Sequence, residues 1–273
     1  MASVLKEIEK LYDEPPIIYL DEDKDIFKKF IELLNEGEIR TVEKKNGKWI
    51  INKAVKKGIL VGFRIGEIIK IKCNSSYYFS DKNTFPLKKV SIESNIRLVP
   101  GGSSIRTGSY IGKNVTMMPP MYINTGAYVD DGTMIDSHAL VGSCAYVGKR
   151  VHLSAGAILG GVLEPIGANP VIIEDDVFIG GNSGIYEGII VKQKAIIAAG
   201  VTITDSTPIY DAVNKKYLEK NEDGIRVIPE KAVIISGTRK LKSDENFSVY
   251  CPIIIKYRDE KSDNSVILES ELR

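Results

Sequence analysis

The strongest constraint on the fold is a six-residue period of apolar residues in the middle of the chain. Every sixth position from 105 to 159 is apolar without a gap. The row is Ile105, Ile111, Met117, Ile123, Val129, Ile135, Val141, Val147, Leu153 and Leu159. The period breaks at residues 164–170, EPIGANP, and resumes at Ile173, Ile179, Ile185, Val191, Ile197 and Ile203. Chance does not produce such a row, so a repeat architecture is predicted.

The residue after each apolar position is often small or turn-prone, as at Gly112, Asn124 and Asp130. Each hexad therefore supplies two inward positions and one turn, and three hexads close a triangular coil of 18 residues. Residues 18 apart should stack on neighbouring coils at roughly 4.8 Å, with their backbone groups paired. The residues predicted to form one such column are Arg106, Asn124, Gly142 and Gly160.

Two insertions are expected to leave the coil, a loop at 164–172 and a hairpin at 207–227 with its turn at 221–224. A last partial coil follows at Ile228 and Ile234. Apolar residues at helical spacing predict an amphipathic helix over 24–35 that ends near Gly37, and 49–63 has a similar pattern. Residues 248–257 and 265–270 are typical of strands.

The predicted fold class is mainly β, a left-handed parallel β-helix with an N-terminal helical domain and a small C-terminal β tail. The expected boundaries are 1–100 for the helical domain, 101–237 for the β-helix and 238–273 for the tail. The outer walls of such a coil are flat and partly apolar, so they need a cover. A homotrimer is the expected solution.

Composition excludes several classes of partner. Lys and Arg number 37 against 36 Asp and Glu, so no overall field attracts nucleic acid or an anionic membrane. No stretch has the apolar length of a signal peptide or a membrane span, which predicts a cytoplasmic protein. Cys73, Cys144 and Cys251 lie far apart, which favours reduced thiols over disulfides or a zinc site.

Coils of this kind occur in acyltransferases, in some carbonic anhydrases and in binding scaffolds, and the fold alone does not choose among them. A carbonic anhydrase needs three imidazoles on one zinc, whereas this chain has only His138 and His152. No metal is therefore expected, and an acyltransferase is the favoured class.

The strings at 126–145, 148–154 and 160–165 resemble the tetrahydrodipicolinate N-succinyltransferases of bacterial lysine and diaminopimelate synthesis. The resemblance extends from about Arg97 to Gly237, with a fainter match at 56–65. It implies that the amine of an open-chain amino-keto dicarboxylate attacks the thioester of succinyl-CoA. That reaction requires a neutral amine, donors for the oxyanion and cations for the anionic groups.

The resemblance assigns substrate and catalytic roles to a few residues. Asp136 matches the aspartate that contacts the amine, whereas Asp130, in the same turn slot, is expected to cap backbone groups. Arg97 matches an arginine that holds a substrate carboxylate, and Arg106 could share this task. Ser143, within the string Gly-Ser-Cys-Ala, is a further predicted substrate ligand.

One position departs from the pattern of many of these enzymes. They carry a glutamate three residues before the one that matches Glu187, and this chain has Gly184 there. Either Glu187 takes the catalytic role or the missing group is less essential. His138 and His152 could act as general bases, as an imidazole does in other hexapeptide acyltransferases, but the resemblance favours interface histidines.

Coenzyme A requires small residues along its pantetheine arm and a cation at its 3′-phosphate. The resemblance places the arm along the later coils, at Gly181, Ala199, Gly200 and Ser206. Arg239 and Lys240, just past the coil, are the phosphate candidates. The alternatives are an acetyl-CoA-dependent enzyme of the same pathway and a non-catalytic coil, which only Gly184 favours.

Overall fold

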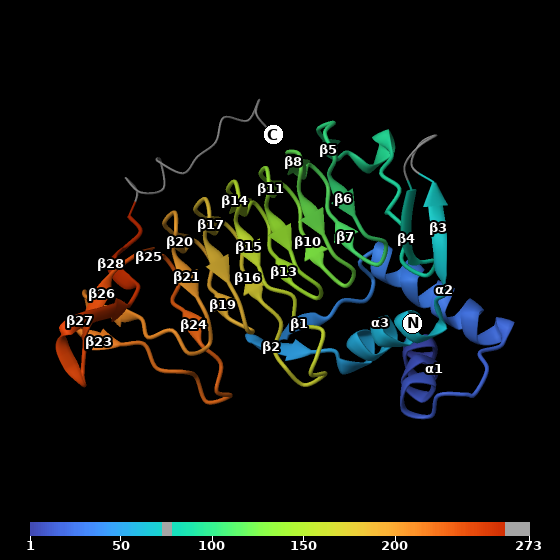
Figure 1. Cartoon of the computed structure of the whole chain (residues 1–273), viewed down its shortest axis with the longest axis horizontal. Coiled ribbons are helices and arrows are strands. Elements are labelled where there is room, and N and C mark those ends of the chain that lie inside the picture. The colour runs from blue at the N-terminus through green and yellow to red at the C-terminus, as the bar shows by residue number, and fades with distance from the viewer. Residues whose placement is uncertain (73–77, 260–273) are drawn as a thin grey trace.

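The structure is a computed structural model that describes residues 1–72 and 78–259. A triangular coil of short parallel strands forms its centre, as Figure 1 shows, with helices at one end and a small antiparallel sheet at the other. The fold is therefore the predicted left-handed parallel β-helix. The helices are α1 (Ala2–Asp13), α2 (Asp21–Asn35), α3 (Lys53–Ile65) and the 3-10 turn η1 (Ile92–Ser94).

The coil has three faces, each a row of parallel strands that are two residues long except for β25. The tyrosine face contains β7 (Tyr110–Ile111), β10 (Tyr128–Val129), β13 (Tyr146–Val147), β16 (Ile172–Ile173), β19 (Ile190–Val191) and β24 (Val227–Ile228). The long face contains β5 (Arg97–Leu98), β8 (Thr116–Met117), β11 (Met134–Ile135), β14 (His152–Leu153), β17 (Phe178–Ile179), β20 (Ile196–Ile197) and β25 (Ala232–Ile235). The third face contains β6 (Ser104–Ile105), β9 (Tyr122–Ile123), β12 (Leu140–Val141), β15 (Ile158–Leu159), β18 (Gly184–Ile185) and β21 (Thr202–Ile203).

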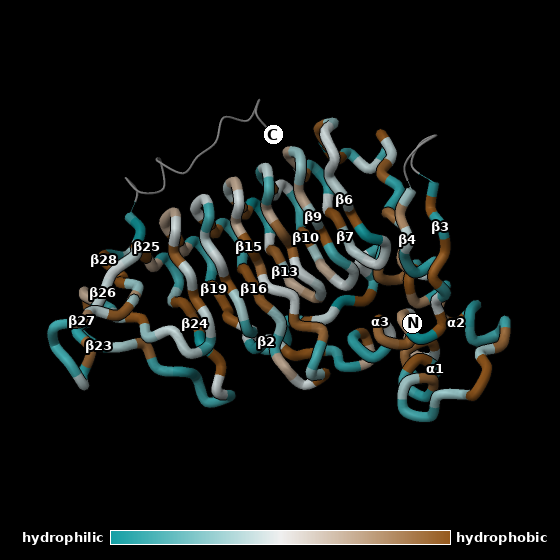
Figure 2. The backbone as a smooth tube through the Cα atoms, in the orientation of Figure 1, coloured by the Kyte–Doolittle hydropathy of each residue, from teal (hydrophilic) through white to brown (hydrophobic). Residues whose placement is uncertain are grey.

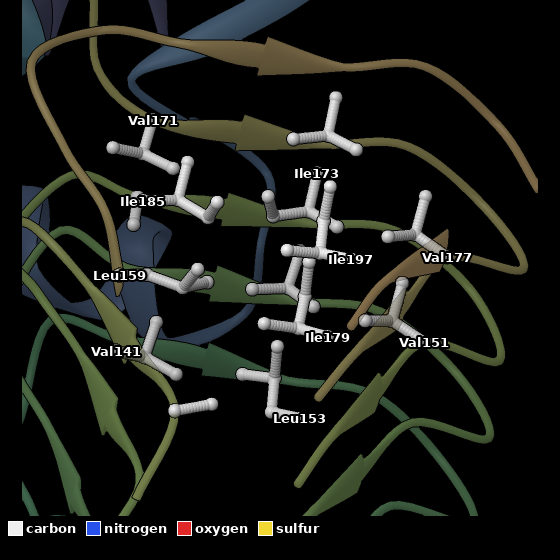
Figure 3. Packing of buried hydrophobic residues seen from close by; sticks show 14 of the residues in the cluster. Val141, Val151, Leu153, Leu159, Val171, Ile173, Val177, Ile179, Ile185 and Ile197 are labelled. Carbon is white, nitrogen blue, oxygen red and sulfur yellow. The ribbon is translucent and has the colours of Figure 1, made fainter. Parts of the chain in front are cut away.

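The predicted apolar row fills the inside of the coil. Side chains of successive coils stack in columns, as Figure 3 shows for Val141, Leu159 and Ile185, and these three are fully buried. Along each coil the hydropathy alternates, as the tube in Figure 2 shows. Burying a side chain of this size stabilises the fold by about 1.5–3 kcal/mol.

Backbone hydrogen bonds join each coil to the next in the predicted register. Residues 18 apart pair, as Tyr128 does with Tyr146, and the N–H of Asn124 donates to the carbonyl of Val141 at 3.0 Å. The column from Arg106 to Gly160 is thereby confirmed. Both insertions return in register, since Tyr146 pairs with Ile172 and Ile190 with Val227.

The third position of most coil turns adopts a left-handed backbone, and the turn 118–121, with Pro120 at this position, is an exception. Glycine supplies this conformation at several turns, for example Gly126 with a φ of 78°. His138 and Cys144 occupy the same turn position with φ values of 62° and 67°. Their backbone conformation thus follows from the repeat.

The N-terminal domain contains hairpins as well as helices, and one sequence prediction for it was wrong. Residues 49–63 do not form one helix, because β2 (Lys48–Ile51) pairs with β1 (Val42–Lys45) before α3 begins at Lys53. The left-handed residues Asn46 and Gly47 form the turn between these strands, and Trp49 packs against Tyr146 with ring centroids 4.7 Å apart. The predicted helix over 24–35 is confirmed by α2.

The first hairpin covers the tyrosine face of the coil. Tyr110, Tyr128 and Tyr146 stack on successive coils, and the guanidinium of Arg40 lies 4.6 Å from the ring centre of Tyr128. Val42 is buried in the same cluster. One of the three outer walls is thus covered by the chain itself.

The C-terminal tail covers the last coil with antiparallel strands. Residues 248–257 were predicted as one strand, but they divide between β27 (Asp244–Tyr250) and β28 (Ile253–Tyr257) at Pro252. Strand β27 pairs with β26 (Thr238–Leu241), and β28 pairs with β25 and with β22 (Tyr210–Asp211) of the inserted hairpin, whose other strand is β23 (Lys216–Tyr217). The predicted strand at 265–270 lies outside the described residues.

In the N-terminal domain, strand β3 (Ile68–Lys72) also pairs antiparallel with strand β4 (Tyr78–Lys82). Cys144 and Cys251 are buried free thiols, and burial raises the pKa of Cys144 to about 11. Cys73 lies outside the described residues. Among the described helices, none combines the length and apolarity needed to cross a membrane.

Helices α2 and α3 approach closely because α3 carries glycine at the contact. A Cβ atom on Gly58 would lie 2.3 Å from Cζ of Phe30, whose side chain is fully buried. Gly58→Ala should therefore destabilise the fold by about 1–3 kcal/mol, although alanine has the better helix propensity. Urea unfolding measures this, with Gly167→Ala as the matched control because a Cβ there meets nothing within 4 Å. Equal stability of the two variants would contradict the prediction.

Lys88 joins the helical domain to the coil, and its Nζ donates to the side-chain oxygen of Asn35 at 2.8 Å. Burial lowers the pKa of Lys88 from 10.5 to about 8. Above pH 8 the unfolded chain binds more protons than the folded one, so this lysine should add stability as the pH rises from about 8 to 10.5. Melting temperatures of the wild type and Lys88→Met should show a difference that changes across this window. Parallel pH profiles would contradict the assignment.

Candidate functional site

The predicted site residues fall mainly on two corners of the coil. The Asp136 corner joins the long face to the third face through the turns 118–121, 136–139, 154–157, 180–183 and 198–201. The Glu187 corner joins the third face to the tyrosine face through 106–109, 124–127, 142–145, the loop 160–171 and 186–189. The third face lies between the two corners.

Asp136 begins its turn and is partly exposed. Its Oδ1 accepts a hydrogen bond from the backbone N–H of Ser137 at 2.7 Å. Asp130 makes the equivalent bond to Asp131 at 2.8 Å, but at a different corner and with a buried side chain. Both aspartates therefore support a turn, and only Asp136 combines this role with access to a ligand.

A strip of small residues continues from Asp136 along the same corner. Gly181 lies two coils further on, and its carbonyl accepts from the N–H of Gly200 at 2.9 Å; Ala199 precedes Gly200. The hydroxyl of Ser236 donates to the carbonyl of Gly200 at 3.4 Å. The strip therefore leads to the β26–β27 hairpin.

Arg239 and Lys240 lie in β26 of this hairpin, Arg239 partly exposed and Lys240 exposed. These two basic residues thus lie in the hairpin that comes directly after the strip of small residues. Ser206 does not belong to this strip, because it lies beside the Glu187 corner, where its hydroxyl is 3.2 Å from that of Thr204. The structure separates it from the other three predicted pantetheine residues.

Glu187 has an unusual backbone for its place in the turn. It is the second residue of its turn, yet its φ is 52°, and the third residue, Gly188, is also left-handed at 73°. In the regular turns 106–109, 124–127 and 142–145 of the same corner, the left-handed residue is the third. The carboxylate accepts a hydrogen bond from the N–H of Asp205 at 2.8 Å. A non-glycine residue held in this conformation is typical of functional sites.

Beside Glu187 lies an open hollow of about 800 Å³. Its lining residues are Gly160, Gly161, Val162, Glu164, Pro165, Ala168, Asn169, Tyr186, Glu187, Thr204 and Asp205. Three of these residues carry carboxylates. The Nζ of Lys220 lies 2.5 Å from the carboxylate of Asp205. The hollow therefore has an acidic lining and favours a ligand with a cationic group.

The wall of the hollow is the inserted loop, which is fixed at two points. The side chain of Lys56, from α3, is fully buried and donates to the carbonyl of Ala168 at 2.6 Å. Burial lowers the pKa of Lys56. The amide of Asn169 donates to the carbonyl of Gly188 at 2.9 Å. The helical domain thereby positions the loop against the turn that holds Glu187.

The two arginines predicted to share a substrate carboxylate lie apart. Arg97 is exposed in β5, the first strand of the long face. Arg106 follows β6 at the Glu187 corner, where it forms an ion pair with Asp81 and lies 5.6 Å from the ring centres of Phe63 and Phe85. The side chain of Arg106 is only 15% exposed, so its contacts favour a role in joining the two domains.

The histidines occupy the long face and the Asp136 corner. His152 lies in β14 with its ring 4.9 Å from that of Phe178, on the outer wall. His138 is exposed, and its backbone N–H donates to the carbonyl of Pro120 at 2.5 Å. Ser143 lies at the Glu187 corner, one coil before Gly161, and its carbonyl accepts from Val162. Their functional roles stay predictions.

Sequence reasoning missed Tyr186 and Lys56. Tyr186 did have a sequence signal, because it directly precedes the turn acid Glu187 and follows a strand that begins with Gly184. The other strands of this face begin with larger residues. Lys56 gave no signal, since a lysine in an amphipathic helix is usually exposed. Its partner is a backbone carbonyl that lies 112 positions away.

Asp136 and Glu187 do not meet within one chain. Six residues, at most about 20 Å of extended chain, lead from Asp136 across the third face to Gly142 at the other corner. Glu187 lies two coils beyond Ser143, about 10 Å further along the axis. The two carboxylates therefore border opposite edges of the third face.

Comparison with known proteins identifies the family. Residues 4–65 match the model described as tetrahydrodipicolinate N-succinyltransferase N-terminal, and residues 170–205 match the hexapeptide repeat of succinyl-transferase. A solved hexapeptide-repeat acetyltransferase from Vibrio cholerae, in complex with acetyl coenzyme A, is 17% identical over 45% of this chain and 64% of its own, with a TM-score of 0.29. That likeness is too weak to support the assignment, which depends on closer relatives.

Three such relatives are named 2,3,4,5-tetrahydropyridine-2,6-dicarboxylate N-succinyltransferase. The protein of Rickettsia felis is 43% identical over 100% of both chains. The protein of Psychrobacter is 42% identical over 97% of this chain and 95% of its own, and that of Ralstonia nicotianae is 45% identical over 89% and 86%. With this identity along nearly its whole length, the chain belongs to the tetrahydrodipicolinate N-succinyltransferase family.

Proposed function

We propose that this chain transfers the succinyl group of succinyl-CoA to the amine of ring-opened tetrahydrodipicolinate, in the succinylase route of lysine and diaminopimelate synthesis. The observation that carries the proposal is the 43% identity over the full length of the Rickettsia felis N-succinyltransferase. The amine nitrogen attacks the thioester carbonyl, the C–S bond breaks, and coenzyme A leaves as a thiol. The products are N-succinyl-2-amino-6-oxopimelate and coenzyme A. A cytoplasmic location stays a prediction.

We infer that the working site lies between two copies of the chain. Asp136 and Glu187 lie at different corners, so one small substrate meets both only if the Asp136 corner of one copy faces the Glu187 corner of the next. The outer row of the long face includes three apolar side chains that are partly exposed in a single chain, Met134, Phe178 and Ile196. A closed ring of three copies covers such walls and forms three equivalent sites.

Each cluster has a distinct role in this arrangement. Asp136 orients the amine or accepts its proton, and Glu187 lies beside the same amine from the neighbouring copy. The strip of Gly181, Ala199 and Gly200 holds the pantetheine arm, while Arg239 and Lys240 bind the 3′-phosphate. Arg97 binds a substrate carboxylate. Succinyl-CoA is the proposed donor, and acetyl-CoA is the alternative.

The reaction and the role of Asp136 are tested by thiol release. We expect release with the cyclic imine dicarboxylate and succinyl-CoA, and a loss of about 10²–10⁴-fold in Asp136→Asn if the carboxylate accepts the proton. Asp130→Asn is the matched control, because it alters the same hydrogen bond at another corner, and it should keep its activity. Release with acetyl-CoA alone would support the alternative donor, and coenzyme A binding without release would indicate a non-catalytic coil.

Mixed oligomers test whether the site is shared. Asp136→Asn and Glu187→Gln should each lose activity, and random mixing of the two chains should restore about one quarter of it, because some interfaces then contain both native carboxylates. The control mixes Asp136→Asn with the double variant, which supplies no native Asp136. Light scattering should give three times the chain mass of 30.2 kDa. No recovery together with a monomeric mass would contradict the shared site.

A further inference from the structure

The side chain of Tyr186 lies in a slot made by two glycines. A Cβ on Gly184 would lie 2.4 Å from Cε2 of Tyr186 and 2.8 Å from its hydroxyl oxygen, and a Cβ on Gly160 would lie 2.9 Å from Cδ1. Neither glycine has a left-handed backbone, so the turn geometry does not require them. Atoms of Tyr186 are among those nearest to a Cβ placed on either glycine. The two glycines make room for this ring.

The slot determines where the hydroxyl lies. Residues 184 and 186 project to the same side of the strand, because side chains alternate along it. The ring therefore extends from the Glu187 corner back over Gly184, with its hydroxyl at the edge between the third face and the hollow. A ring wedged against two backbone segments has little freedom, so the hydroxyl is held in position before a ligand arrives.

The Tyr186 hydroxyl is also a neutral hydrogen-bond donor that can serve a ligand in the hollow. Of the other lining side chains with a neutral donor, the amide of Asn169 is used by Gly188 and the hydroxyl of Thr204 lies 2.9 Å from that of Thr207. Within the described part of the chain, the Tyr186 hydroxyl makes no hydrogen bond. The carboxylates of Glu164 and Glu187 border the same space.

We propose that Tyr186 is a substrate-positioning residue whose hydroxyl donates a hydrogen bond to a carboxylate of the amine substrate. The inference rests on the proposed function and adds to it which end of the substrate binds in this hollow. An acidic lining repels the phosphates of coenzyme A but attracts an ammonium group. An amino acid end presents an ammonium to the carboxylates and its own carboxylate to the tyrosine, so the hollow binds the α-amino carboxylate end of the acceptor.

Tyr186→Phe tests the proposal, because it keeps the ring in its slot and removes only the hydroxyl. We expect kcat/KM for the amine substrate to fall on the order of tenfold to a hundredfold, as for a lost hydrogen bond to a charged group, with an unchanged KM for succinyl-CoA and an unchanged melting temperature. Tyr217→Phe, on the exposed inserted hairpin, is the matched control and should leave both constants unchanged. Equal kinetics of Tyr186→Phe and the wild type would overturn the proposal, as would a loss confined to succinyl-CoA.

Binding of 2-aminopimelate without any acyl-CoA separates this inference from the proposed reaction. Calorimetry should show a tenfold to hundredfold weaker Kd for Tyr186→Phe, whether or not the chain turns over the cyclic imine. Gly184→Ala is a second variant that keeps the hydroxyl but displaces it, and it should weaken the same binding. Undiminished binding by both variants, or no binding by the wild type, would overturn the assignment of this end of the substrate to the hollow.

Discussion

The backbone pairing of each coil with the next is the constraint on which the rest of the structure depends. A strand of two residues has no stability of its own, and the strands of the coil pair their backbone groups with the next coil, as between the N–H of Tyr128 and the carbonyl of Ala145 at 2.9 Å. This pairing fixes the register, and the register fixes which side chains enter the core. It also means that an insertion is tolerated only where the chain leaves at a corner and returns to the same rung.

The same constraint explains why so much of the fold is predictable from sequence. The coil repeats one local rule, so the apolar row from Ile105 to Ile203 specifies the inward positions, the columns and both insertions without long-range information. The region around Trp49 follows no such rule. Its apolar residues fit a helix equally well, and the strand is selected by the left-handed Asn46-Gly47 turn that joins β1 to β2 together with the contact of Trp49 with Tyr146, far away in the sequence.

The candidate site is less predictable, because its chemistry depends on where corners lie in space. Sequence spacing places Asp136 in a turn, but a turn acid that supports its own backbone looks the same at Asp130. The structure separates them by corner and exposure. It also removes Ser206 from the strip of Gly181 and Gly200 and gives Arg106 a partner in Asp81, relations that no spacing along the chain encodes.

The two glycines under Tyr186 illustrate how a repeat acquires function. In a coil built from one rule, every departure from that rule must be compatible with the coils above and below it. A large ring on an outer position requires space on its own strand and on the preceding coil, and Gly184 and Gly160 provide it. Glu187 departs from the rule in the same turn, through its left-handed second position. Both departures border one hollow, and this hollow is where we propose that the chain binds its substrate.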